Sequence, residues 1–89
     1  MAWRIEFSAD AVRQIDELDK QIARRIDKFL LERLASLENP RSIGNALQGS
    51  QFGEFWRYRV GDYRIICRIL DERLVVVVVA LGHRKEIYR

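Results

Sequence analysis

The first residues of the chain alternate between apolar and polar side chains, which predicts a half-buried strand over residues 2–8. Its apolar positions are Trp3, Ile5 and Phe7. Ser8 suits the N-cap of a helix over residues 9–18, because its hydroxyl can accept a hydrogen bond from a backbone N–H of the first turn. The chain is therefore predicted to open with a strand and a short helix.

A second helix is predicted from Asp19, which can cap it, to about residue 38. Its apolar residues recur at helical spacing and form one face, made of Ile22, Ile26, Phe29, Leu30, Leu34 and Leu37. Asn39 and Pro40 end this helix, because proline disfavours a helical conformation in the residue before it. Two helices joined so closely form an antiparallel hairpin, and their apolar stripes can cover one face of a sheet. The helices are interpreted as scaffold.

The second half of the chain predicts a loop followed by strands. Residues 41–53 contain three glycines and no sustained period, which indicates a loop, with Leu47 held in the core. Three strands are predicted over residues 54–60, 63–70 and Leu74–Leu81, with turns at Gly61-Asp62 and Asp71-Glu72. The five valines Val75–Val79 lack alternation, which indicates a central strand covered on both faces. The predicted order is β-α-α-β-β-β, an α+β fold.

The length of 89 residues suits one domain, predicted to span residues 1–89. The longest apolar run, Leu74 to Gly82, is far shorter than the ~20 residues that cross a bilayer, and charges occupy the position of a signal peptide's apolar core. A single cysteine, Cys67, forms no internal disulfide, and no cluster of cysteine and histidine has metal-ligand spacing. We expect no metal, no membrane partner and a reducing cytoplasm.

The net charge of +3 hides an uneven distribution of charge along the chain. Residues 1–40 hold seven basic and eight acidic side chains, whereas residues 41–89 hold nine basic and five acidic ones. Eight of those nine cations are arginine, whose planar fork suits bidentate contacts with phosphate. The expected partner is therefore a nucleic acid or an acidic protein.

Four arginines of the second half are predicted to share one face of the sheet. If Gly61-Asp62 closes a two-residue hairpin, Arg59 lies opposite Arg64. Arg57 is then diagonal to Arg64, and Arg68 projects from the same face. Because like charges directly opposite one another destabilise a sheet, an external anion would explain the pair. The alternative is an open face of solvated arginines whose stems shield apolar surface.

His83, Arg84 and Tyr88 follow the last predicted strand, where the chain could fold their side chains over the same arginines. Tyr88 could stack on a nucleobase or seal the edge of the sheet. His83 is the only histidine, and an imidazole can take up or release a proton near neutral pH. It is therefore a candidate catalytic group, with an ordinary surface residue as the alternative.

Motifs for the common hydrolytic chemistries are missing from the sequence. It has no Ser-His-Asp order, no phosphate-cradling P-loop, no HExxH and no paired cysteines. RNA offers a reaction that needs no cofactor, because its 2′-hydroxyl can attack the adjacent 3′-phosphate while clustered cations stabilise the added charge. DNA lacks that internal nucleophile. The residues therefore favour RNA cleavage without a cofactor.

Two segments of the sequence resemble the RelE/ParE superfamily of bacterial and archaeal toxins from toxin–antitoxin pairs. They are LENPRSIGNALQG and WRYRVGDYRIICRILDERLVVVVVALGHRKEIYR. The most specific parts are the hairpin WRYRVGDYRI and the terminal GHRKEIYR, whereas the first two helices match only in pattern. The resemblance covers nearly the whole chain. It implies a small antiparallel sheet with two helices on one face and a concave basic surface on the other, as in RelE.

RelE-like members cleave mRNA in the ribosomal A site without metal, and the resemblance carries their site onto this sequence. Arg57 and Arg59 would orient the substrate and stabilise charge, and Arg64 would bind the scissile phosphate. Arg84 would contact that phosphate or assist protonation of the leaving group, while Tyr88 would stack on the nucleotide. Further RNA-binding residues are expected at Arg41, Arg68, Lys85 and Arg89.

The sequence departs from RelE at the first strand of the hairpin, where the best-known relatives have lysines. A lysine whose pKa is lowered by neighbouring cations can act as a base, but the two arginines of this strand stay protonated. The proton would then pass to His83, Glu86 or a ribosomal group, or the enzyme would rely on positioning alone. Asn45 and Gln48 also stand where relatives often carry lysine, which implies weaker affinity for the ribosome.

The resemblance also implies partners, and it leaves two alternatives. The partners are a cognate antitoxin with an acidic tail, mRNA on the ribosome and, through the antitoxin complex, operator DNA. ParE-like members share the fold but poison DNA gyrase by protein contact. A further alternative is an inactive toxin that mainly represses its own operon. The set of arginines and tyrosine favours the nuclease.

Overall fold

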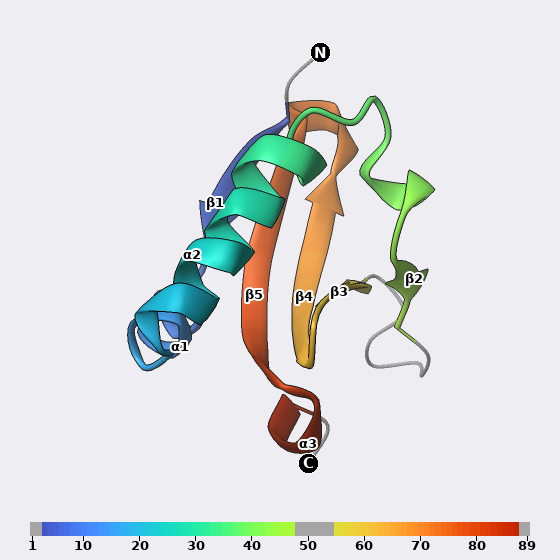
Figure 1. Cartoon of the computed structure of the whole chain (residues 1–89). Coiled ribbons are helices and arrows are strands. Elements are labelled where there is room, and N and C mark those ends of the chain that lie inside the picture. The colour runs from blue at the N-terminus through green and yellow to red at the C-terminus, as the bar shows by residue number, and fades with distance from the viewer. Residues whose placement is uncertain (1–2, 48–54, 88–89) are drawn as a thin grey trace.

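A five-stranded sheet carries helices α1 and α2 on one face in the computed structural model, which describes residues 3–47 and 55–87 (Figure 1). The strands are β1 (Arg4–Phe7), β2 (Asn45–Ala46), β3 (Phe55–Val60), β4 (Tyr63–Leu70) and β5 (Val75–His83). The helices are α1 (Ala9–Asp16), α2 (Lys20–Lys28), a π-helical continuation (Phe29–Leu34), α3 (Arg84–Ile87) and two 3₁₀ turns (Pro40–Ser42 and Asp71–Arg73). The α+β class is confirmed, and the predicted order β-α-α-β-β-β is present with two additions, the short strand β2 and the terminal helix α3.

Strand β5 lies at the centre of the sheet, whose order is β1-β5-β4-β3-β2. The central position predicted for the valine run is confirmed, but its coverage is incomplete, because Val75, Val76 and Val78 are at most 2% exposed whereas Val77 and Val79 are half-buried. The pairing of β5 with β4 is antiparallel, but its pairing with β1 is parallel, so the sheet is mixed rather than wholly antiparallel. Parallel pairing needs a long connection, and the helices and the β3–β4 hairpin supply it.

Both predicted helix caps are present. The Ser8 hydroxyl accepts from the Ala11 N–H at 3.1 Å, and the Asp19 carboxylate accepts from the Gln21 N–H at 3.0 Å. The apolar face of the second helix packs on the sheet, and its fully buried members are Ile26, Leu30 and Leu34. The helical periodicity therefore identified the buried face correctly.

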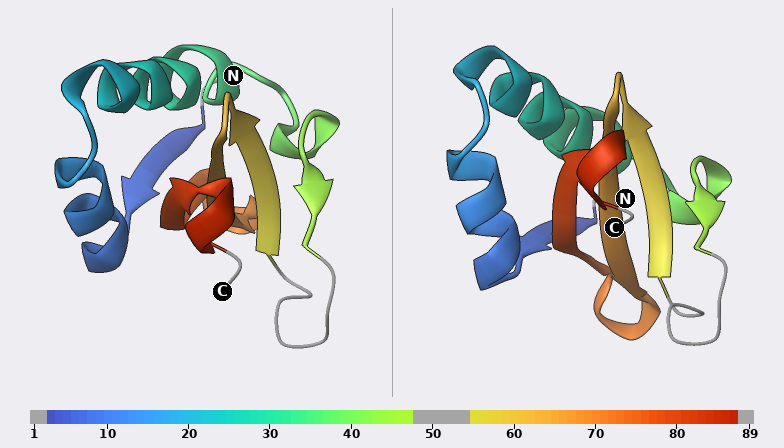
Figure 2. Two further views of the ribbon diagram at one scale, coloured as in Figure 1. Left: turned by 60° about the horizontal axis from the view of Figure 1, so that its bottom comes forward. Right: turned by 90° about the horizontal axis from the view of Figure 1, so that it is seen from below.

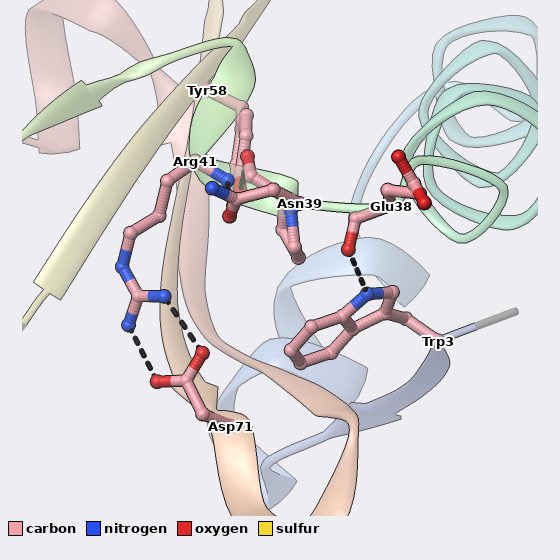
Figure 3. A network of polar contacts seen from close by, with 7 residues as sticks. Trp3, Glu38, Asn39, Arg41, Tyr58 and Asp71 are labelled. Atoms are coloured by element: carbon pink, nitrogen blue, oxygen red, sulfur yellow. Dashed lines mark hydrogen bonds and ion pairs between the residues drawn. The ribbon is translucent and has the colours of Figure 1, made fainter. Parts of the chain in front are cut away.

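The second helix widens into a π-helix at Phe29–Leu34 and does not run on to residue 38. The Ala35 N–H donates to the Leu30 carbonyl at 3.0 Å, and the Ala35 carbonyl accepts from the Trp3 N–H at 2.7 Å. The Trp3 indole also donates to the Glu38 carbonyl at 3.0 Å (Figure 3). The chain just before β1 thus fixes the end of the helix. π-Helical segments are rare in proteins and frequently lie at functional sites.

The predicted loop over residues 41–53 contains the short strand β2, which pairs with Trp56 and Arg57 of β3. Gly44, just before β2, has a φ of +78°. A Cβ at this position would lie 2.6 Å from the Arg57 carbonyl oxygen, so glycine is needed both for the backbone conformation and for the close approach to β3.

Two aromatic side chains of β3 hold this loop in place. The Trp56 indole donates to the Ile43 carbonyl at 2.7 Å, and the Tyr58 hydroxyl donates to the Pro40 carbonyl at 2.7 Å. Burial raises the pKa of Tyr58, which keeps its hydroxyl protonated as the donor. Contrary to expectation, the half-buried Leu47 is not among the residues that pack against the core, whereas Ile43, in the described part of the loop, is.

Candidate nucleic-acid interface

The register of the β3–β4 hairpin confirms the predicted pairing of two arginines. Arg59 lies directly opposite Arg64, across a turn in which Gly61 has a φ of +59°. On the side of these two strands that faces the helices, four residues pack in or against the core; they are Trp56, Tyr58, Tyr63 and Ile65. We call the opposite face of the sheet, which carries Arg57, Arg59, Arg64 and Arg68, the arginine face. Side chains alternate across the sheet, so these four project together.

Arg64 belongs to the arginine face and is only 7% exposed, so it is not one of the solvated arginines of an open face. Gly82 lies opposite Arg64 on β5 and presents no side chain that would occupy the space of the guanidinium. Arg64 Nη1 donates two long hydrogen bonds of 3.3 Å, to the carbonyls of Gly61 and Tyr63. Among the side chains of residues 3–47 and 55–85, no carboxylate pairs with it. Because a buried cation without a counter-ion is unfavourable, this guanidinium is suited to bind an external anion.

The arginines of β3 differ from Arg64 in exposure. Arg59 is exposed and Arg57 is half-buried, and both line a hollow of about 200 Å³ beside Gly44 and Asn45. Residues directly opposite one another in a hairpin have neighbouring side chains, so an anion bound between Arg59 and Arg64 would meet one exposed and one buried guanidinium. Arginine stays protonated in proteins. The cluster therefore supplies charge and hydrogen-bond donors, but no base.

Helix α3 follows β5 at the end of the sheet where the β3–β4 hairpin turns (Figure 2). The Arg84 N–H donates to the Asp62 carbonyl at 2.8 Å, which ties α3 to the turn just before Arg64. The side chains of Arg84 and Lys85 are exposed. The backbone of Arg84 therefore lies at the same end of the sheet as the Arg64 guanidinium. Tyr88 and Arg89, also predicted as site residues, lie outside the described residues.

His83 does not lie over the arginine face, which corrects the expected placement. It pairs with Tyr63 on β4, and the two rings meet edge to face with their centroids 5.5 Å apart. Paired residues project from the same face, which for Tyr63 is the helix face. His83 Nδ1 accepts from the Lys85 N–H at 3.2 Å, so this ring nitrogen is already engaged within the protein. His83 is therefore poorly placed to act as a base at Arg64.

Arg41, predicted to bind RNA, forms an ion pair with Asp71 (Figure 3). Its two terminal nitrogens donate to the two carboxylate oxygens at 2.8 and 3.0 Å. This hydrogen bonding lowers the pKa of Asp71 and raises that of Arg41. The pair ties the turn at Pro40–Ser42 to the turn between β4 and β5, and it uses the donors that would otherwise meet a phosphate.

The remaining predicted residue of the sheet, Arg68, lies away from the centre of the site. It is exposed on β4 and lines a separate pocket of about 350 Å³ with Arg41 and Phe55. The structure thus gathers Arg57, Arg59 and Arg64, with Arg84 beside them, and leaves Arg68 at a second position on the same face.

Two helical arginines join the surroundings of the site, although the helices were interpreted as scaffold. Arg25 and Arg33 line a groove that also contains Arg59. The sequence carries a weak sign of this, because the second helix holds five cations, which are Lys20, Arg24, Arg25, Lys28 and Arg33. Only the packing of that helix against the hairpin places two of these arginines beside β3.

Within residues 3–47 and 55–87, no three side chains among His, Cys, Asp and Glu are grouped so that they could hold a metal ion. In the same two ranges, no helix has both the length and the apolar character needed to cross a membrane.

Cys67 is buried, and burial raises the pKa of its thiol. The hydrogen bonds that the Arg64 guanidinium makes to described residues go to backbone carbonyls, and its cross-strand neighbour is Arg59.

This sheet, with its helical hairpin on one face and arginines on the other, defines a RelE-like toxin domain. The structure superposes on the RelBE2 toxin–antitoxin complex of Mycobacterium tuberculosis with a TM-score of 0.85 and 26% identity, covering 97% of this chain and 95% of that chain. It superposes on the archaeal RelE–RelB complex of Pyrococcus horikoshii with a TM-score of 0.72 and 27% identity, covering 97% and 99% of the two chains.

Sequence comparison gives the family. A family model described as "ParE toxin of type II toxin-antitoxin system, parDE" matches residues 5–88. The chain is 30% identical to the mRNA interferase toxin RelE of Escherichia coli, over 99% of this chain and 92% of that protein. It is 32% identical to the toxin RelG of Mycobacterium tuberculosis, over 100% and 99% of the two. The chain therefore belongs to this toxin family and to the RelE/ParE superfamily.

Proposed function

We propose that this protein is a ribosome-dependent mRNA endoribonuclease, the toxin of a type II toxin–antitoxin pair that inhibits translation in the cytoplasm. The observation that supports this most is the buried Arg64, which has two long hydrogen bonds to carbonyls and no described carboxylate partner. A phosphodiester between Arg64 and the exposed Arg59 would accept hydrogen bonds from both. The mRNA interferase activity named for the relative from Escherichia coli, at 30% identity, supports the same activity here.

In the proposed reaction, the 2′-oxygen of a ribose attacks the adjacent phosphorus, and the bond from phosphorus to the 5′-oxygen breaks. The products are a 2′,3′-cyclic phosphate and a 5′-hydroxyl, with no metal or other cofactor. Arg64 binds the scissile phosphate, while Arg57 and Arg59 orient the strand and stabilise the charge added in the transition state. Arg84 contacts the phosphate or assists protonation of the leaving oxygen, and Tyr88 stacks on the nucleotide.

The proton of the 2′-hydroxyl needs an acceptor, and the described part of the arginine face offers none. Guanidiniums stay protonated, and the His83 ring lies against Tyr63 on the other face of the sheet. We therefore assign this proton to a ribosomal group or to Glu86, whose side chain lies outside the described part of the structure. With a ribosomal group as the acceptor, the protein contributes positioning and electrostatic stabilisation, which alone can supply a large part of an enzyme's rate enhancement.

A cognate antitoxin is the proposed protein partner. Two of the solved structures that this chain resembles are complexes of RelE-type toxins with RelB-type antitoxins. An acidic antitoxin tail would neutralise the arginine face, and the complex would bind operator DNA. Affinity that rests on charge complementarity falls with salt, mainly through the association rate. Co-purification with a small co-encoded protein, and release of that protein at high salt, test this partner.

The experiment that tests the proposed function is a primer-extension map of mRNA from translating ribosomes after addition of the toxin. Discrete cuts in the reading frame support the nuclease, and Arg64→Ala should remove them. Intact mRNA throughout would contradict it. Arg13→Ala is the matched control, since Arg13 is exposed on α1 and pairs with Asp10.

A gyrase-directed toxin is the second candidate. One observation favours it: the family model that matches the chain is described by ParE. In that case, DNA breaks would accumulate while mRNA stays intact, and alanine at Arg57, Arg59, Arg64 and Arg84 would leave growth arrest unchanged. A toxin with neither effect would act mainly in repression of its operon.

A further inference from the structure

A second basic surface lies between the helical layer and the end of the β3–β4 hairpin. It is a groove of about 680 Å³, which we call the helix groove. The residues of the groove that carry the argument are Arg25, Lys28, Glu32, Arg33, Arg59 and Gly61. Figure 2 shows the arrowhead end of β3 directed toward the helical layer, so one groove is bounded by both.

The helix groove concentrates positive charge. It holds four cations, Arg25, Lys28, Arg33 and Arg59, and one carboxylate, Glu32. All four cations are exposed, and in the described part of the chain none of them forms an ion pair. Like charges that line a concave surface repel one another and raise the local positive potential. An external polyanion would therefore bind there favourably.

Two local features hold these cations at the groove. Arg33 lies in the π-helical segment Phe29–Leu34, whose wider turn is fixed by the hydrogen bonds of Ala35. Arg25 packs on the hairpin turn, because a Cβ added at Gly61 would lie 3.2 Å from Arg25 Nη1. The glycine of the turn thus leaves room for a helical guanidinium.

The helix groove is continuous with the arginine face. The hollow that contains Arg57 shares Phe29, Arg33 and Arg59 with the helix groove. Strand β2 pairs with β3 only at Trp56 and Arg57, so the edge of β3 beyond these residues has no neighbouring strand in the described chain. A path for a ligand therefore runs from the arginine face, around the edge of β3, to the helices.

We propose that the helix groove binds the phosphate backbone of the RNA strand whose scissile phosphate lies on the arginine face, an inference that rests on the proposed function. A strand held at Arg59 carries further phosphates on either side, and the helix groove presents unpaired cations to them. Contacts to single-stranded RNA depend on such basic grooves. An acidic peptide would also need apolar anchors, and Phe29 and Val60 are the only large apolar side chains along this groove.

The test uses the full chain and an RNA of about 12 nucleotides, a length within the site size of single-strand binders, with 2′-O-methyl groups that prevent cleavage. The groove variant carries Arg25→Gln, Lys28→Gln and Arg33→Gln. The control variant carries Arg13→Gln, Lys20→Gln and Arg73→Gln, which remove the same charge from exposed residues outside the grooves described. Fluorescence anisotropy at several salt concentrations gives the affinity and its salt slope.

We expect the groove variant to bind roughly 10- to 100-fold more weakly than the control at about 0.1 M salt, with a salt slope smaller by about 2, because three phosphate contacts are lost. Equal affinities and slopes for the two variants would overturn the inference. So would a groove variant that keeps its RNA affinity but loses binding to a glutamate-rich peptide, which would make the groove a protein-binding surface.

Cleavage on translating ribosomes, measured in parallel with the unmodified protein, separates this inference from the proposed function. If the unmodified protein cuts mRNA and the groove variant binds RNA as the control does, only the inference fails. If the unmodified protein makes no cuts and yet RNA affinity depends on the groove, the proposed function fails and the groove stands as an RNA-binding surface.

Discussion

Arg59 and Arg64 lie directly opposite one another across the β3–β4 hairpin, yet Arg59 is exposed and Arg64 is 7% exposed. Two cations in this arrangement repel one another, and the buried one has also lost most of its contact with water. Binding of an anion would offset this repulsion and loss of hydration, because a phosphate would neutralise both guanidiniums. For the proposed substrate this relationship would be a form of preorganisation, since the donors are in place before it binds.

Replacing Arg64 should separate stability from activity. We expect Arg64→Met to raise the free energy of unfolding by about 1 kcal/mol, because an apolar side chain of similar volume removes a buried charge that has no counter-ion. The same variant should lower single-turnover cleavage by about 10²–10³-fold. Urea denaturation and a ribosomal cleavage assay measure the two effects.

Arg59→Met is the matched control for this substitution. Since Arg59 is exposed, its replacement should change the free energy of unfolding by less than about 0.5 kcal/mol. If Arg64→Met strongly lowered the free energy of unfolding, the guanidinium would have a structural role in the protein without a bound anion.

His83 should contribute to stability and not to proton transfer. We expect His83→Ala to leave the pH profile of single-turnover cleavage within about threefold of the original over about pH 5–8. Loss of the ring contact with Tyr63 should lower the free energy of unfolding by about 0.5–1.5 kcal/mol. His83→Phe should restore much of that stability. If the pH dependence of cleavage disappeared in both His83→Ala and His83→Phe, His83 would take part in proton transfer.

The ion pair between Arg41 and Asp71 should make a small, pH-dependent contribution to stability. The pKa of Asp71 is lowered by its hydrogen bonds with Arg41, so its contribution is present above the unfolded value of about 3.9 and is lost as pH falls through the folded value. Both side chains are substantially exposed, so we expect Asp71→Asn to cost only about 0.5 kcal/mol at neutral pH.

Urea denaturation of the original protein and of Asp71→Asn at neutral pH and at about pH 2–3 checks this linkage. The two stabilities should converge at the acidic end. A difference of the same size at both pH values would show that the substitution acts through something other than the charge of Asp71.

Gly44 should be a sensitive position because of its backbone and its surroundings. We expect Gly44→Ala to lower the free energy of unfolding by about 1–3 kcal/mol, since the φ of +78° is strained for alanine and its Cβ would clash with the Arg57 carbonyl. Thermal unfolding measures the loss. Gly61→Asn is the control, because asparagine tolerates positive φ and only the flexible Arg25 side chain lies near. Equal losses at the two positions would contradict this account.

The sequence by itself determined the elements and the hairpin at the centre of the site. The caps at Ser8 and Asp19, the helical stripe and the valine strand follow from local rules of hydrogen bonding and periodicity. The turn at Gly61-Asp62 fixes the register between its two strands, and that register alone puts Arg59 opposite Arg64.

Only the tertiary structure decided which residues surround those arginines. A bulge in the β4–β5 pairing shifts the register by one residue between Ile66 and Cys67. Because side chains alternate with a period of two, this shift places Gly82 opposite Arg64 and turns His83 to the helix face, whereas an unbroken ladder would place His83 on the arginine face. The burial of Arg64 and the helix groove likewise depend on packing between segments that are far apart in the chain, and no local pattern in the sequence records that packing.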